Sequence, residues 1–113
     1  MKYKSHITIQ DNSNKVLEEA KLKKIQMLVA IGEKAIAIWA KLITKEKLVD
    51  TGRYRGSVSY KEGNDHVIIG SNVEYAPFLE LGTSKMRARP TLKPTVLNYR
   101  NTYKKLAEQI WKS

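Results

Sequence analysis

Hydrophobic and polar residues alternate along the first few positions of the chain and then change period. Residues 3–10 place Tyr3, Ile7 and Ile9 on one face and polar side chains on the other, which predicts a half-buried strand. From residue 15 to about residue 48, apolar side chains recur every three or four positions while lysines fill the opposite face. This pattern predicts one long amphipathic helix. Gly32 interrupts it, and serves either a close crossing or a bend.

The sequence pattern of the second half of the chain predicts a β-hairpin between short helices. Asp50 and Thr51 are good N-cap residues, so a short helical turn is expected to begin there. Two alternating runs then flank the turn sequence EGND at 62–65, which predicts an antiparallel hairpin. Residues 74–81 have helical spacing and stop at Gly82.

The last segment contains two prolines and a clean helical stripe. Pro90 and Pro94 are expected to keep residues 89–93 extended and to delay the next helix until about residue 94. That helix is predicted to run over 94–112, because apolar residues recur at steps of three and four. The order of elements favours an α+β fold, in which a small, mostly antiparallel sheet packs against one long N-terminal helix and a C-terminal helix.

Length and composition narrow the class of protein. The 113 residues suit a single domain spanning 1–113 with one modest core. The chain has no cysteine, which excludes disulfides, thiolate metal sites and cysteine nucleophiles. The net charge is +10, and residues 83–113 hold eight bases and one acid. Such a basic segment either binds polyanions or is a solvated face.

A search for catalytic groups finds little. His6 and His66 lie in predicted strands without a carboxylate or second histidine at ligand spacing. Glu74 and Glu80 are six residues apart, which places them on different faces of a short helix. The DTG triplet at 50–52 lacks the β-rich cleft and the second aspartate that an aspartic protease needs. We therefore expect no enzyme activity and no metal or cofactor.

Nucleic-acid binding is the leading alternative function. Lys85, Arg87 and Arg89 cluster in a predicted loop, and Tyr99 and Tyr103 follow. These tyrosines lie on the apolar stripe of the last helix, so a place in the core is favoured over base stacking. No helix-turn-helix pattern accompanies them. A small basic DNA-binding protein remains an alternative.

Three short sequences in the middle of the chain form a recognisable series. They are VDTGRYRGSV at 49–58, VEYAPFLELGT at 73–83 and ARPTLKPT at 88–95. Together they resemble the bacteriophage head–tail joining or tail-completion family, the gene-product-ten-like minor structural proteins of siphophages and prophages. The family pattern is roughly TG-x-L-R-x-S, then YA-x-x-x-E-x-GT, then RP-F-L-x-P. The matching positions are Thr51, Gly52, Arg55, Ser57, Tyr75, Ala76, Glu80, Gly82, Thr83, Arg89, Pro90, Leu92 and Pro94.

Two positions depart from the family pattern. Tyr54 stands where leucine is usual, which is a tolerable apolar exchange. Thr91 stands where phenylalanine is usual, which removes an anchor beside the basic loop.

The resemblance implies a non-enzymatic protein of the virion neck that joins tail to head through contacts within a ring. Its partners would be other neck and tail proteins and copies of itself, with DNA contact in the channel left open. It would reside in the host bacterial cytoplasm before assembly, and it would need no membrane, cofactor or small-molecule substrate.

The resemblance also assigns roles to the motif residues. Tyr75, Phe78 and Leu81 are expected to pack a short helix into the core, and Glu80 to pair with Arg55 or Arg89. The loop at 83–89 would be a basic arm for a neighbouring subunit or DNA, poorly ordered in the free monomer. The expected interface comprises the motif residues together with Lys85, Arg87, Arg89, Pro90 and Pro94.

Overall fold

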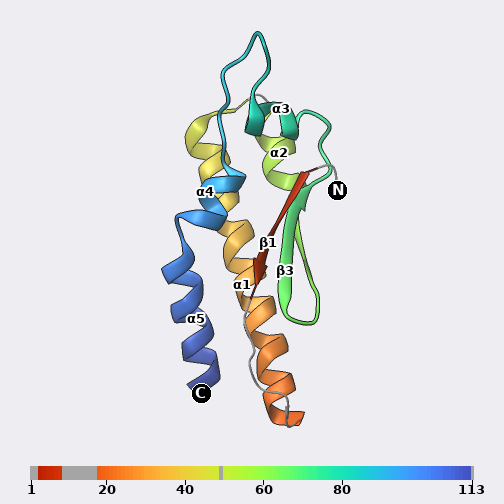
Figure 1. Cartoon of the computed structure of the whole chain (residues 1–113). Coiled ribbons are helices and arrows are strands. Elements are labelled where there is room, and N and C mark those ends of the chain that lie inside the picture. Colours follow the sequence, from red (N-terminus) through yellow and green to blue (C-terminus); the bar gives the residue numbers. More distant parts are fainter. Residues whose placement is uncertain (1–2, 9–17, 49, 113) are drawn as a thin grey trace.

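The computed structural model describes residues 3–8, 18–48 and 50–112, which form an elongated molecule of 52 × 22 × 20 Å (Figure 1). The elements are β1 (Tyr3–Thr8), α1 (Glu18–Glu46), α2 (Thr51–Ser57), β2 (Val58–Glu62), β3 (His66–Ser71), α3 (Ala76–Leu81), α4 (Leu92–Leu97) and α5 (Arg100–Lys112). The fold is α+β, as predicted. We call α1, α5 and the sheet the stem, and α2, α3, residues 82–91 and the start of α4 the loop end.

The long helix is confirmed over the residues that the structure describes. It runs from Glu18 to Glu46, and the predicted start at residues 15–17 lies outside the described part of the chain. Its predicted end at residue 48 is wrong by two residues, because Lys47 adopts a left-handed conformation with φ 49°. Gly32 serves a close crossing: a Cβ at this position would lie 2.3 Å from Cδ2 of Tyr60. The ring of Tyr60 therefore rests directly on the helix backbone.

The sheet has three antiparallel strands in the order β1-β3-β2. The predicted hairpin is confirmed, and its turn is closed by the amide of Gly63, which donates to the carbonyl of His66 at 2.8 Å. The central strand β3 buries Val67 and Ile69 completely. The first strand pairs along its described length with β3, so that Tyr3 lies opposite Ser71 and Thr8 opposite His66.

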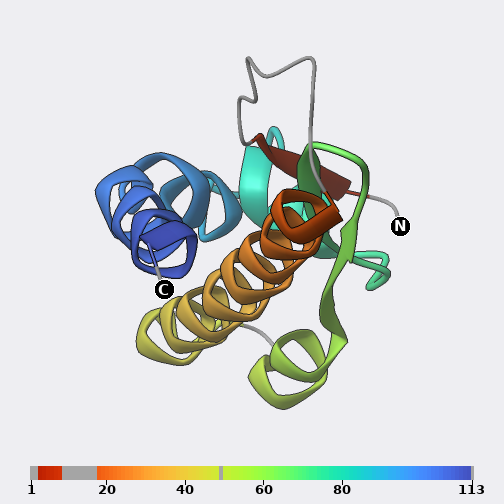
Figure 2. The ribbon, with the colours of Figure 1, turned by 90° about the horizontal axis from the view of Figure 1, so that it is seen from below.

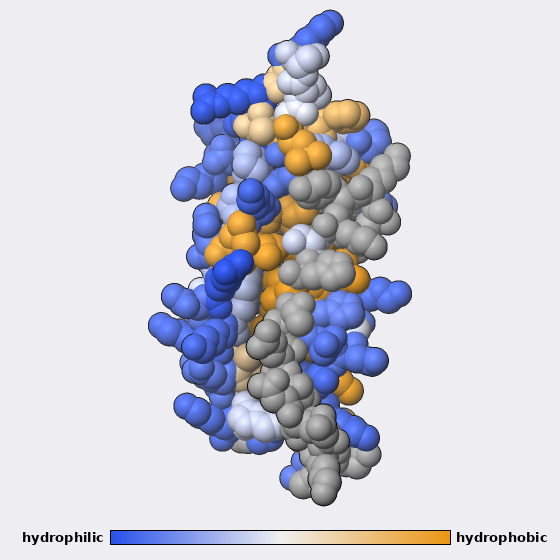
Figure 3. Space-filling model, in the orientation of Figure 1, coloured by the Kyte–Doolittle hydropathy of each residue, from blue (hydrophilic) through white to orange (hydrophobic). Residues whose placement is uncertain are grey.

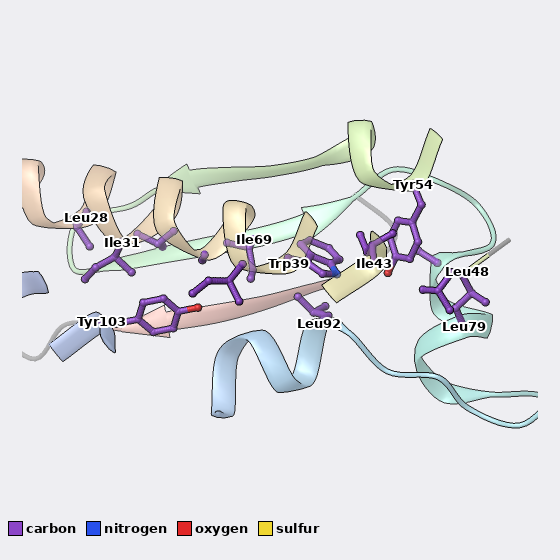
Figure 4. Close-up of a cluster of buried hydrophobic side chains, with 14 residues drawn as sticks. Leu28, Ile31, Trp39, Ile43, Leu48, Tyr54, Ile69, Leu79, Leu92 and Tyr103 are labelled. Carbon is purple, nitrogen blue, oxygen red and sulfur yellow. The ribbon is translucent and has the colours of Figure 1, made fainter. Parts of the chain in front are cut away.

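The hydrophobic core follows α1 along the length of the molecule (Figure 4). The sheet covers one side of this helix and α5 lies along another, as the view down the axis shows (Figure 2). The largest fully buried apolar side chains are Trp39, Tyr54, Leu28, Ile31, Ile43, Ile69, Leu92 and Val67. No described helix has the length and apolar character that crossing a membrane requires.

The predicted single helix over 94–112 is wrong in two respects. The helical segment begins at Leu92 and is divided into α4 and α5 at Asn98 and Tyr99. At the division the carbonyl of Thr95 accepts a hydrogen bond from the hydroxyl of Tyr103 at 2.6 Å. A continuous helix would have given that carbonyl to the amide of Tyr99. The apolar stripe nevertheless remains on the core side of both helices.

The start of α2 also differs from the expected cap. Asp50 occupies the N-cap position, but its backbone is left-handed, with φ 52°, and its side chain makes no capping hydrogen bond. The hydroxyl of Thr51 instead donates back to the carbonyl of Leu48. Two left-handed residues, Lys47 and Asp50, thus turn the chain from α1 into α2.

Candidate interaction surface

The three sequence motifs meet at the loop end of the molecule, where α2, α3 and the start of α4 lie together (Figure 1). Their residues divide into an interior set and a surface set. The buried positions are Tyr54, Ala76, Glu80, Thr91 and Leu92, and the half-buried ones are Thr51, Ser57, Tyr75, Gly82 and Pro94. The exposed motif positions are Gly52, Arg55, Thr83, Arg89 and Pro90, and the loop residues Lys85 and Arg87 between the second and third motifs are also exposed.

Glu80 organises the interior of the loop end. Its carboxylate accepts hydrogen bonds from the backbone amides of Thr91 and Leu92 at 3.0 and 2.9 Å, and from Lys93 at 2.9 Å. These amides are the unpaired donors at the start of α4, and the next residue, Pro94, has no N–H. A negative charge at a helix N-terminus also interacts favourably with the helix dipole. This cap explains why α4 begins before Pro94.

The predicted pairing of Glu80 with an arginine is therefore wrong. Arg55 donates to the hydroxyl of Thr44 at 3.1 Å. The guanidinium of Arg89 donates to the backbone carbonyl of Glu46 and lies 3.7 Å from its carboxylate. Both arginines thus tie the loop end to the last turns of α1. The available signal was a glutamate followed eleven residues later by a threonine and fourteen residues later by a proline, and it is weak without the fold.

Thr91 is a buried anchor, which corrects the expectation that it weakens the docking of the loop. Its side chain is 1% exposed, and its hydroxyl accepts a hydrogen bond from the indole Nε1 of Trp39 at 2.9 Å. A phenylalanine at this position would leave the indole without this acceptor. The ring of Trp39 also meets Tyr54 edge-to-face, and Tyr54 meets Tyr75 in the same way.

An exposed ion pair joins α2 to the segment before α3. The guanidinium of Arg53 makes two hydrogen bonds to the carboxylate of Glu74, at 3.1 and 2.9 Å, and lies over the ring of Tyr75. The hydrogen bond and the charge of Glu74 raise the pKa of Arg53. This pairing links α2 to the segment before α3, and sequence reasoning did not anticipate it.

The outer face of α3 is apolar and exposed. Phe78 is 54% exposed and Leu81 is 68% exposed, so the expectation that both pack into the core is wrong. The core side of this helix holds Ala76, Leu79 and Glu80. Because the helix has only six residues, occupying its inner face with Glu80 turns Leu81 outward.

The loop that follows α3 closes on itself beside these side chains. The amide of Thr83 donates to the carbonyl of Met86 at 2.9 Å, and the amide of Arg89 donates to the carbonyl of Leu79 at 2.7 Å. Gly82 is required here, because its φ is 78° and a Cβ would lie 2.8 Å from the amide nitrogen of Ala88. The expected loop is confirmed, and the ordering of residues 83–89 on assembly stays a prediction.

The loop places basic side chains next to the apolar ones. Met86 is 36% exposed, and Lys85 and Arg87 on either side of it are exposed. Neither basic side chain forms an ion pair with a residue that the structure describes. We call Phe78, Leu81, Lys85, Met86 and Arg87 the apical surface. Figure 3 shows hydrophobic and hydrophilic side chains mixed at this end of the molecule.

The comparisons with known proteins bear on the first two motifs and not on the third. No significant match was found among curated proteins or among solved structures. A family model described as "Bacteriophage HK97-gp10, putative tail-component" matches residues 7–82. This range includes α1, the hairpin and α3, and therefore the interior residues Tyr54, Tyr75 and Glu80. The match spans well over half of the chain, and the protein belongs to this HK97-gp10-like family.

Proposed function

We propose that this protein is a non-enzymatic structural component of a phage or prophage virion neck, where it joins the tail to the head. The apical surface is the observation that carries the proposal. Exposed apolar side chains beside cations, at one end of an elongated molecule, suit a protein–protein contact. Phe78 and Leu81 lie within the part of the chain that matches the family.

The hydrogen bonds beneath the apical surface favour this role. Glu80 fixes the start of α4, and Arg89 fixes the end of the loop against α1. The α3 side of the surface, held by such bonds, loses little conformational entropy when a partner docks on it, whereas the ordering of residues 83–89 on assembly remains a prediction. Leu81 and Phe78 are then presented as rigid anchors, which is how the few residues that dominate an interface usually act.

The proposed assembly is a ring of identical subunits that forms at the end of the tail. The net charge of +10 makes free subunits repel one another, so the protein stays monomeric in dilute solution in the host cytoplasm. This repulsion is screened within about 8–10 Å at physiological salt, and a template that supplies acidic partners overcomes it. The exposed motif residue Gly52 and the exposed loop residues Lys85 and Arg87 lie at the end that would meet such partners.

Complementation of a phage lacking the gene tests this function. Phe78→Ser and Leu81→Ser, singly and together, should leave the fold intact and leave unjoined heads and tails visible by electron microscopy. Leu97→Ser is the matched control, because Leu97 is 40% exposed on α4, outside the apical surface. Normal joining by the folded double variant would overturn the role of the apical surface. Normal joining without the gene would overturn the neck function.

Salt dependence separates this function from that of a small DNA-binding protein. Counterion release makes DNA affinity fall steeply as salt concentration rises. If Lys85 and Arg87 contact channel DNA only non-specifically, duplex binding should vanish at moderate salt. Tight, sequence-selective binding that persists there would favour the DNA-binding alternative.

A further inference from the structure

A groove lies between α1 and the junction of α4 and α5, on a different part of the molecule from the apical surface. Its volume is about 390 Å³. It is lined from α1 by Lys34, Ile38, Lys41, Leu42 and Lys45, and from the other side by Tyr99 and Thr102. This stretch of α1 lies beside α4 and the junction of α4 and α5, whereas the rest of α5 runs beside the N-terminal half of α1 (Figure 1).

The charges along this groove have one sign. Lys34, Lys41 and Lys45 lie seven and four residues apart, which puts them on one helix face over about 16 Å at a rise of 1.5 Å per residue. None of them forms an ion pair with another residue that the structure describes. Like charges four residues apart destabilise a helix by a few tenths of a kcal/mol, roughly, so folding does not favour this arrangement.

The acids of α1 nearest to these lysines are directed elsewhere. Glu46 lies against Arg89 at the loop end. Glu33 lies on the side of the helix that faces the hairpin, where burial and then the Glu33 carboxylate raise the pKa of Tyr60. The groove itself is therefore cationic, with no carboxylate among its lining residues.

The floor of the groove is apolar. Ile38 is 9% exposed, and Leu42 and Tyr99 are half-buried side chains that pack against the core. A sugar–phosphate backbone has no apolar stripe to place on such a floor. Single-strand binding sites stack successive bases on several aromatic rings, and Tyr99, half-buried against the core, is the one aromatic side chain among the lining residues. A protein segment with apolar side chains flanked by carboxylates matches both the floor and the rim.

We propose that this groove binds an acidic amphipathic helix from another virion protein. About three helical turns would span the three lysines, with carboxylates at intervals of seven and four residues and leucine-like side chains against Ile38 and Leu42. That the partner is a virion protein rests on the proposed neck function. The preference of the groove for an acidic amphipathic helix does not depend on that function.

Binding of a synthetic peptide tests the groove directly. The probe is an amphipathic helix of about 14 residues, roughly four turns, with leucines on one face and glutamates on its flanks. Titration followed by NMR should shift the resonances of Ile38, Leu42 and Thr102 with saturation. A peptide with lysine in place of glutamate should give no saturable shift. Absence of saturable shifts with the acidic peptide would overturn the proposal.

Two sets of variants give the matched comparison. Lys41→Glu with Lys45→Glu should raise the dissociation constant about tenfold or more, since each reversal replaces an attraction by a repulsion. Lys61→Glu with Lys104→Glu changes the net charge by the same amount at exposed positions outside the groove lining. This pair should change the dissociation constant by less than about threefold. Leu42→Ala should weaken binding without changing charge. If both double charge-reversal variants weaken peptide binding equally, the effect comes from net charge alone, and the proposed binding site is overturned.

Duplex DNA and phage complementation complete the test. Saturable DNA shifts at the same residues, stronger than those of the peptide, would assign the groove to a polyanion and overturn the proposal. A folded Lys41→Glu, Lys45→Glu variant should fail to restore infectivity. If it restores infectivity while Phe78→Ser with Leu81→Ser does not, the groove is dispensable and the neck function still stands.

Discussion

The stem and the loop end are held together by different kinds of interaction. In the stem, Leu28, Ile31, Val67 and Ile69 are buried against one another by apolar contact (Figure 4). In the loop end, the segment that starts α4 donates hydrogen bonds to the buried carboxylate of Glu80 and accepts one from the indole of Trp39, which reaches it from α1. Apolar contact has no direction, whereas hydrogen bonds fix both distance and angle.

Because of this difference, the two regions tolerate amino-acid substitutions to different degrees. An apolar core accepts exchanges that conserve volume at a cost below about 1.5 kcal/mol. A buried carboxylate with three donors accepts almost none, because each donor left without a partner costs about 1–3 kcal/mol. The loop end is therefore the less replaceable region, although it contains fewer buried apolar residues.

Removing the central carboxylate should produce the largest effect. Glu80→Ala leaves the amides of Thr91, Leu92 and Lys93 without their acceptor, and we expect a loss of about 3–5 kcal/mol in the free energy of unfolding. Urea unfolding measures this loss, and hydrogen exchange should accelerate at the same three amides. Glu74→Gln is the control, because substituting that exposed side chain should lower the free energy of unfolding by less than about 1 kcal/mol. Equal costs for both substitutions would show that the cap does not hold the loop end.

Adding a methyl group to the packed interior of the stem should give the next largest loss of stability. A methyl group at Gly32 would meet the ring of Tyr60, and we expect Gly32→Ala to destabilise the protein by about 1–3 kcal/mol despite the better helix propensity of alanine. In a Tyr60→Ala background the same substitution should become stabilising. Thermal unfolding of the wild type, the two single variants and the double variant gives this double-mutant cycle. Additive effects would contradict the close crossing.

The hydroxyl of Tyr103 provides a pH-dependent test at the point where the two regions meet. Burial raises the pKa of Tyr103 to about 12. Its contribution to stability is thus complete below pH 10 and declines as pH rises towards 12. Tyr103→Phe loses the hydrogen bond to Thr95, and should be about 1 kcal/mol less stable at pH 7. The difference between the two proteins should shrink above pH 10. A difference that stays constant up to pH 12 would contradict the raised pKa.

Two glycines in the loop end should behave in the opposite way to Gly32. A Cβ at Gly52 or Gly56 would meet nothing within 4 Å. Each change to alanine should therefore stabilise α2 by about 0.5–1 kcal/mol in the free protein, measured as a rise in melting temperature. If the exposed side of α2 joins the neck interface, the more stable variants should assemble less well. Destabilisation of the monomer would show that α2 is packed more closely than the structure has it.

The stem could be predicted from the sequence because its residues act through periodicity. The apolar steps of α1 and the alternation of β2 and β3 are local patterns, and they determine which face is buried. The loop end could not be predicted in the same way. Glu80 caps a helix eleven residues further along the chain, and Trp39 reaches Thr91 across fifty-two residues.

The surface of the loop end was hard to predict for a related reason. Phe78 and Leu81 have the composition of core residues, and only the inward placement of Glu80 turns them outward. The motifs predicted which segments matter, but not which side chains lie inside. The groove between α1 and the α4–α5 junction had no local signal, because its lysines have the pattern of the solvated face of an amphipathic helix.

The order of strands in the sheet also constrains how the chain is made. Strand β1 ends at Thr8, and its pairing partner β3 begins only at His66. Ribosomes add residues at roughly 5–20 per second, so β1 waits for several seconds before β3 has been made. The hairpin of β2 and β3 needs only local closure and can form as soon as it emerges. The residues of β1 are thus made long before they can pair, and the edge of β3 stays open to pairing with other chains until β1 docks on it.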